Sequence, residues 1–188
     1  MDRRAFVSTA LGGAAALCTA RAPAQDAELE KVAGEYLTPA AQKAIAKGLA
    51  FLASRQKDDG SFGDAGYSRN TAVCALAGMA FMSSGSTPGR GPYGGNVDRC
   101  LDFILAHTEN SGFINVEGAT THGPMYGHGF ATLFLAEAYG MTLRADIREK
   151  LSKAVQLIVQ TQNREGGWRY QPVRQDADIS VTICQVMA

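Results

Sequence analysis

The sequence predicts an all-α protein in which two kinds of helix alternate. One kind is amphipathic, with apolar residues three or four positions apart, and the other is almost free of charge. A glycine-containing turn joins each amphipathic helix to the apolar helix after it, and this arrangement occurs three times. No segment alternates polar and apolar residues as a half-buried strand does. With 188 residues and 46% hydrophobic side chains, the chain suits one domain with a sizeable core.

The first 24 residues have the pattern of an export signal. Arg3 and Arg4 precede a short uncharged run that ends at Ala20, and an Ala-Pro-Ala site follows at 22–24. The twin arginine resembles the signal of the pathway that exports folded proteins. We therefore expect cleavage after Ala24, a linker over 25–37, a repeat domain over 38–188 and a location in the periplasm or outside the cell. The uncharged run is too short for a membrane span, so we expect no stable transmembrane helix after signal removal; an uncleaved anchor is the alternative.

The three turns place a polar side chain six residues before an aromatic one, with glycine between them. Their residues are Gln56, Gly60 and Phe62; His107, Gly112 and Phe113; and Gln162, Gly167 and Trp168. Glycine suits the end of a helix because it tolerates the left-handed conformation. We expect the aromatic residue to pack across the helix ends against the glutamine amide, which gives the motif a structural role.

The helices on either side of each turn follow from caps and periodicity. Thr38 and Pro39 open a helix that runs to about Arg55, Asn96 is expected to cap the second amphipathic helix, and Asp146 begins the third. The apolar helices are expected at 70–82, 129–139 and 179–188. Together these give three helical hairpins, at about 39–83, 96–140 and 144–188. Helices that are apolar on most sides must be buried, so the pattern predicts two layers of antiparallel helices.

The repeated Gln-x-x-x-Gly-x-aromatic pattern resembles the QW motif of the squalene cyclases and the prenyltransferase and squalene oxidase repeat. The similarity covers about residues 40–188 and is weaker at His107 and Phe113, where glutamine is missing. The resemblance implies an α/α toroid, a ring of alternating inner and outer helices. Three hairpins would form only part of such a ring, so the exposed flank of the last apolar helix favours self-association if this segment exists alone.

The resemblance also implies a catalytic acid at Asp178 with Asp176 as its partner. Squalene cyclases carry Asp-x-Asp-Asp-Thr, and this chain has Asp176 and Asp178 but Ile179 and Ser180 at the last two positions. Protonation of an alkene needs a carboxylic acid that is kept neutral. The alternative is that Asp178 caps the following helix, where its carboxylate would have a lowered pKa.

Other candidates lie near the second apolar helix. His122, Tyr126 and His128 fall in the segment expected to form a loop before it, and they could orient a substrate or donate a proton. Local hydrogen bonding is the alternative. Phe130 and Phe134 could line an apolar cavity or stabilise a carbocation, or they could be core residues.

The composition restricts the partners. Eighteen basic and eighteen acidic residues balance, which removes the electrostatic case for nucleic acid. The cysteines are expected to be buried free thiols, and no Cys/His cluster predicts a metal; we expect no cofactor. Two functions remain: an exported protein that acts on or binds an apolar isoprenoid, or a non-catalytic binding or scaffold module outside the cytoplasm.

Overall fold

The computed structural model describes residues 37–119 and 123–188. The expected signal peptide, almost all of the expected linker and the candidate residue His122 lie outside these residues. Contacts divide the chain into two units, one that ends at Lys47 and one from Gly48 to Ala188, which holds the helices and turns discussed below. The boundary between the units falls within the first described helix.

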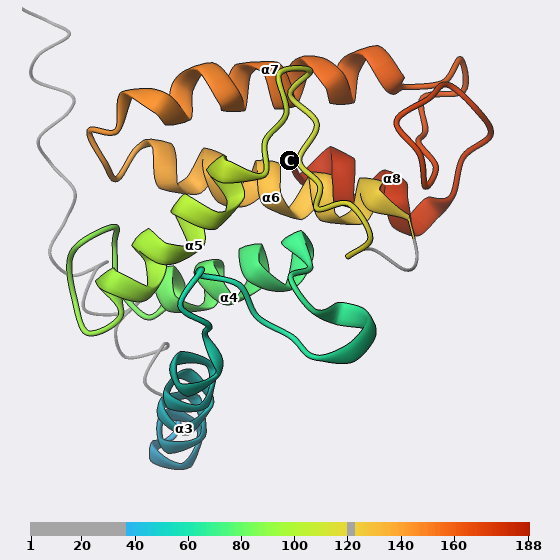
Figure 1. Ribbon diagram of the computed structural model, residues 1–188. Coiled ribbons are helices and arrows are strands. Elements are labelled where there is room, and N and C mark those ends of the chain that lie inside the picture. Colours follow the sequence, from blue (N-terminus) through green and yellow to red (C-terminus); the bar gives the residue numbers. More distant parts are fainter. Residues whose placement is uncertain (1–36, 120–122) are drawn as a thin grey trace, which may run out of the picture. The chain divides into compact units, whose positions relative to one another are not determined.

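The described residues are all-helical, as expected, and contain no strand. Six α-helices and one short 3-10 helix occur in the order α3 (Pro39–Arg55), η1 (Ala65–Tyr67), α4 (Thr71–Ser83), α5 (Gly94–Ala106), α6 (Pro124–Tyr139), α7 (Ala145–Thr161) and α8 (Ile179–Met187). Figure 1 shows α7 running alongside α6, with α8 near the start of α6. For the part of the chain that the structure describes, the prediction of an all-α fold is confirmed.

Two of the expected helix starts are wrong. Helix α5 begins at Gly94, so Asn96 lies inside it rather than capping it, and its side-chain amide donates to Gln56 Oε1 at 2.9 Å instead. Helix α6 begins at Pro124, five residues before the expected start, because proline is well suited to the first helical turn. Tyr126 and His128 therefore lie on a helix and not in a loop.

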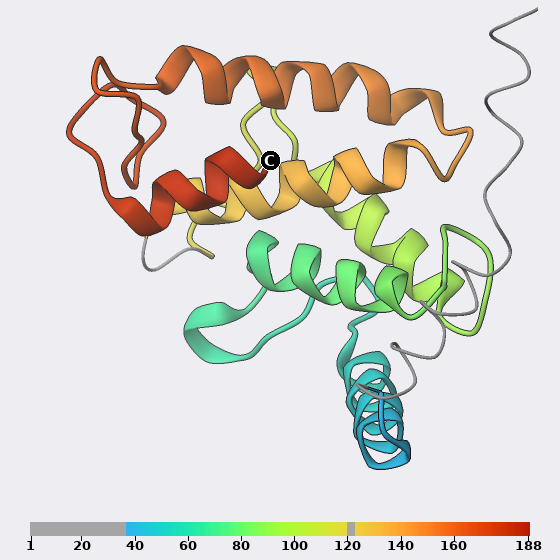
Figure 2. The same ribbon diagram turned by 180° about the vertical axis from the view of Figure 1, so that it is seen from behind.

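The helices of the second unit pack around α6. Helix α6 contacts α4, α7 and α8, while α5 contacts α4 and α7. The reverse view in Figure 2 shows α4, α6 and α8 on one side of α7. A large core joins α4, α5 and α6, and a smaller cluster of Met125, Ile158, Trp168 and Val181 joins the ends of α6, α7 and α8. The nearly uncharged helices thus bury much of their surface against one another.

The same pair of backbone hydrogen bonds closes three turns. In the first turn the N–H of Lys57 donates to the carbonyl of Ser61, and the N–H of Gly60 donates back to Lys57, both at 2.9 Å. In the second turn the N–H of Glu109 donates to the carbonyl of Phe113, and the N–H of Gly112 donates to that of Glu109. In the third turn the N–H of Asn163 donates to the carbonyl of Gly167, and the N–H of Gly166 donates to that of Asn163. The glycine in each turn has a positive φ, 85°, 88° and 88°.

This hydrogen-bond pattern changes the residue alignment expected from the sequence. In the third turn the positive-φ glycine is Gly166 and not Gly167. The buried apolar residue that follows each turn is Phe62, Ile114 and Trp168, so Ile114 and not Phe113 occupies the position in the second turn. The glutamine amide donates to the turn glycine, from Gln56 to the Gly60 carbonyl at 3.2 Å and from Gln162 to the Gly166 carbonyl at 2.9 Å.

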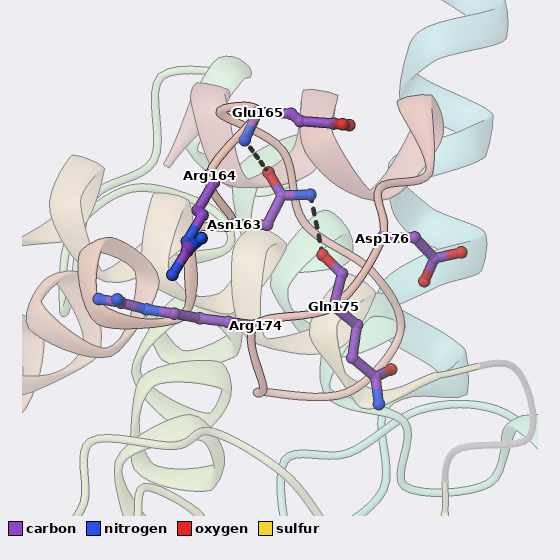
Figure 3. A pocket seen from close by; sticks show the side chains of 6 residues that line it. All are labelled: Asn163, Arg164, Glu165, Arg174, Gln175 and Asp176. Carbon is purple, nitrogen blue, oxygen red and sulfur yellow. Dashed lines mark hydrogen bonds between the residues drawn. The ribbon is translucent and has the colours of Figure 1, made fainter.

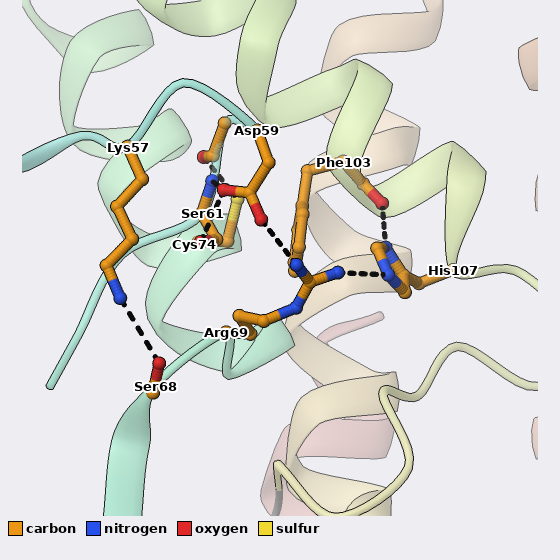
Figure 4. A network of polar contacts seen from close by, with 9 residues as sticks. Lys57, Asp59, Ser61, Ser68, Arg69, Cys74, Phe103 and His107 are labelled. Carbon is orange, nitrogen blue, oxygen red and sulfur yellow. Dashed lines mark hydrogen bonds and ion pairs between the residues drawn. The ribbon is translucent and has the colours of Figure 1, made fainter. Parts of the chain in front are cut away.

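A polar network holds the first turn against the end of α5 (Figure 4). Arg69, which has a φ of 56°, donates to Asp59 at 2.7 Å and to His107 Nε2 at 3.0 Å. An arginine can only donate, so His107 accepts at Nε2 and carries its proton on Nδ1, 2.7 Å from the carbonyl of Phe103. His107 therefore has a structural role beside the second turn.

Candidate functional site

Asp178 lies in a cluster of hydroxyl groups at the start of α8. It is the N-cap residue of α8, and its Oδ1 accepts hydrogen bonds from the backbone N–H of Ser180 at 2.9 Å and of Val181 at 3.2 Å. Tyr170, from the segment before the helix, donates to Oδ2 at 3.2 Å. Tyr126, from the first turn of α6, is hydrogen-bonded to the hydroxyl of Ser180, which also donates to Asp178.

These contacts favour an ionised Asp178. The hydroxyl of Ser180 and the backbone N–H groups of Val181 and Ser180 stabilise the carboxylate and lower the pKa of Asp178. The hydrogen bond to Asp178 in turn raises the pKa of Tyr170. The cluster can therefore accept a hydrogen bond or orient a polar group, but it does not hold the neutral carboxylic acid that alkene protonation requires.

Asp176 has a different partner from the one the resemblance implies. Its carboxylate forms an ion pair with Arg169, whose guanidinium also lies 5.1 Å from the ring centre of Tyr170. Among the hydrogen bonds and ion pairs of the described residues, none joins Asp176 to Asp178. The structure thus brings Asp178 together with Tyr126, and leaves Asp176 on the exposed loop.

His128 is a core residue. It is fully buried on α6, its Nδ1 accepts from the backbone N–H of Ile114 at 3.2 Å, and its Nε2 lies 3.2 Å from the carbonyl of Ala154. Because Nδ1 accepts, the proton lies on Nε2 and the ring is neutral. Burial lowers the pKa of His128 to about 4, although the bond to Ala154 opposes the shift. Both ring nitrogens are engaged, and their partners lie 14 and 26 residues away in the sequence, so these hydrogen bonds are not the local ones expected.

The two phenylalanines of α6 also pack into the core. Phe134 is fully buried, and a Cβ atom added at Gly78 would lie 2.5 Å from its ring. Phe130 is partly buried against the same core. Their packing matches the core alternative.

An apolar groove lies between the last turns of α4 and α6. It has a volume of about 360 Å³ and is lined by Met79, Met82, Ser83, Leu133, Glu137 and Met141. The exposed surface near it is also apolar, since Leu76 on α4 is 46% exposed. This groove was not predicted from the sequence, although Met79 and Met82 are three residues apart and so lie on one face of α4.

The described residues contain little else that suggests a cofactor site. No group of three or more His, Cys, Asp or Glu side chains is placed to hold a metal ion in the described part of the chain. Within the same ranges, 37–119 and 123–188, no helix is both long and apolar enough to cross a membrane. A second hollow, of about 540 Å³, lies beside the third turn and is lined by polar residues of 163–165 and 174–176.

Comparison with known proteins gives no match: no protein-family model, curated protein or solved structure is similar enough to assign the chain to a family.

The cap geometry leads to a prediction for Asp178. Replacement by alanine removes the acceptor for two backbone N–H groups, so we expect Asp178→Ala to lower Tm by roughly 2–4 °C, the usual size of a lost helix cap in a chain of this length. Asp178→Asn should lose less, because asparagine is also a good N-cap. Thermal unfolding followed by circular dichroism measures both. Asp176→Ala is the control, since its ion pair is exposed and should contribute little.

Proposed function

We propose that the chain is a non-catalytic repeat module of the squalene cyclase and prenyltransferase type, which binds an apolar isoprenoid chain outside the cytoplasm. The observation that carries the binding role is the methionine-lined groove of about 360 Å³ between α4 and α6. Methionine side chains are flexible and polarisable, so they adapt to an unbranched or methyl-branched hydrocarbon. The volume lies within the usual range of small-molecule sites.

An α/α toroid is the arrangement that we propose for the repeats. Three turns with the same hydrogen bonds and the contacts of α6 with both α4 and α8 support it. In a toroid the apolar helices form the inner wall, so the groove between α4 and α6 would face the cavity. The export proposal has a separate basis, the pattern of residues 1–24.

The N-cap geometry of Asp178 supports binding over catalysis. A carboxylate that accepts two backbone N–H groups and a serine hydroxyl favours its ionised form. A cyclase acid must instead hold a proton that it can deliver to a carbon–carbon double bond. Glu137, the one acidic residue among the six that line the groove, is exposed to solvent.

The binding role is tested with farnesol as a probe. Isothermal titration of the full chain should detect binding, and Leu133→Lys should weaken it at least roughly tenfold, because a lysine ammonium would be placed in the apolar groove. Leu76→Lys is the matched control, since Leu76 is exposed on α4 but does not line the groove.

Two results would contradict the proposal. Equal affinities in the wild type and in Leu133→Lys would exclude the groove as the site. If the wild type converts a polyprenyl substrate and Asp178→Asn does not, Asp178 is a catalytic acid and the module is not purely a binding protein.

A further inference from the structure

The third turn differs from the first two in what its glycine touches. A Cβ atom added at Gly60 would lie 2.1 Å from the carbonyl oxygen of Arg99 on α5, and one added at Gly112 would lie 2.4 Å from that of Lys153 on α7. At Gly166 the nearest atom is Nε2 of its own neighbour Gln162, at 3.8 Å. Two turns therefore rest on the backbone of the next amphipathic helix, and the third has no helix against it among the described residues.

The helices that receive a turn share a short sequence feature. The contact on α5 is Arg99 followed by Cys100, and the contact on α7 is Lys153 followed by Ala154, a basic residue followed by a small one. Each basic residue lies 13 positions before the glycine of the turn that ends its own helix. The same spacing from Gly60 leads to Lys47 and Gly48 on α3.

No described residue covers the corresponding position on α3. Gly48 is exposed, and a Cβ atom added there would meet nothing within 4 Å among the described residues. Lys47 is also exposed and makes no hydrogen bond or ion pair with another described residue. Within residues 37–119 and 123–188, one receiving position on a helix thus has no turn against it, and one turn has no helix against it.

The third turn already has the conformation that the first turn uses for docking. In the first turn, Gln56 Oε1 accepts from Asn96 Nδ2 at 2.9 Å and from Arg99 Nε at 3.0 Å, both on α5. Gln162 makes the same bond to its glycine carbonyl, but its Oε1 has no donor among the described residues. A basic residue at the position of Arg99 would supply one.

Side-chain bonds hold the third turn in this conformation. Asn163 Oδ1 accepts from the backbone N–H of Glu165 at 2.9 Å and of Gly167 at 2.8 Å, and its Nδ2 donates to the carbonyl of Gln175 (Figure 3). A partner would therefore meet a surface that is formed in advance, which lowers the entropy cost of binding.

We propose that the chain assembles head to tail, with the third turn of one copy docked on α3 of a second copy at Lys47 and Gly48. In this contact Lys47 would donate to Gln162 Oε1, and Gly48 would allow the close approach that Cys100 and Ala154 allow within the chain. Such a contact uses two different surfaces, so it closes into a ring or extends into a filament. Ile183 and Val186 lie on α8, the helix that follows the third turn, and are 51% and 73% exposed, so they add exposed apolar surface to this copy. The proposal does not depend on the apolar ligand.

Sedimentation velocity of the full chain over a range of concentrations tests the assembly. We expect the mass to rise with concentration above that of one chain, and Gly48→Trp to raise the dissociation constant roughly ten- to a hundredfold by filling the site. Gly48→Ala is the matched control, because alanine stands at the equivalent place on α7, and it should still assemble. A single species of one chain's mass at every concentration, or assembly that Gly48→Trp leaves unchanged, would overturn the proposal.

Directed cross-linking tests the direction of the contact. In a Cys18→Ser background, Lys47→Cys and Gln162→Cys are made in separate preparations, since Cys74, Cys100 and Cys184 are buried. A mixture of the two should form disulfide-linked dimers faster than either preparation alone. If Lys47→Cys alone or Gln162→Cys alone cross-links fastest, the contact is symmetric and the head-to-tail arrangement is wrong.

Discussion

Gly112→Ala should lower the free energy of unfolding by about 3–5 kcal/mol, a large effect for the addition of one methyl group. Two costs combine at this position. The φ of Gly112 is 88°, which a residue with a side chain adopts at a cost of about 1–2 kcal/mol. The added Cβ would also lie 2.3 Å from the carbonyl carbon of Lys153, so the turn and α7 must separate. Backbone atoms on both sides leave no flexible side chain to move away.

Gly166→Ala separates the two costs. Gly166 has the same φ of 88°, but no backbone atom lies within 4 Å of an added Cβ. In a dilute, monomeric sample it should lose only about 1–2 kcal/mol, the conformational cost alone. Urea denaturation of both variants gives the comparison. Equal losses would mean that the second turn does not rest on the backbone of α7.

Helix positions followed closely from the sequence where capping and periodicity agree. Pro39, Asn70 and Ile179 mark helix starts at or within one residue of the prediction, because each lies at or beside a preferred cap and before an apolar run. The prediction at Asn96 was wrong because its side-chain amide donates a hydrogen bond to Gln56, 40 residues earlier in the sequence. Such a long-range hydrogen bond leaves no local signal, so a good cap residue can lie in the middle of a helix.

The turns were found from the sequence, but not their alignment. Gly166 and Gly167 are adjacent, and spacing alone does not tell which of them has positive φ; the hydrogen bond from Gly166 to Asn163 decides it. Asn70 and Asp178 have the same role as N-caps, each accepting from the backbone N–H groups two and three residues later, although they do not lie at the same distance from their turns. One N-cap is a neutral asparagine and the other an aspartate, which indicates that both helix starts require a hydrogen-bond acceptor.

The candidate site was harder to predict because it depends on tertiary contacts. Tyr170 reaches Asp178 from a loop, and Leu133 meets Met79 only when α6 packs on α4. His128 has the residue type of a catalytic group, and only its burial between Ile114 and Ala154 reveals its structural role. Sequence alone gave the helical faces but not which faces meet.

His128→Ala should cost about 3–4 kcal/mol of the free energy of unfolding. The substitution leaves a cavity in the core, removes the acceptor of the Ile114 N–H and leaves the Ala154 carbonyl without its donor. His128→Gln should cost less, because an amide supplies both an acceptor and a donor. Urea denaturation at pH 7.5, roughly one unit above the ordinary pKa of histidine, measures both without a contribution from protonation. A loss as small as that of a surface substitution would contradict the structural role of the ring.

The same residue should make the stability depend on pH. The pKa of His128 is about 4 in the folded chain and 6.5 ordinarily, so the unfolded chain binds a proton in this range and the folded chain does not. The stabilisation is therefore complete above pH 6.5 and is lost as the pH falls toward 4, by about 3 kcal/mol in all. The free energy of unfolding, measured by urea denaturation at intervals between pH 7.5 and 4.5, should fall less steeply in His128→Gln than in the wild type. Identical slopes would show that His128 titrates alike in both states, and that the buried neutral ring is not the source of the acid sensitivity.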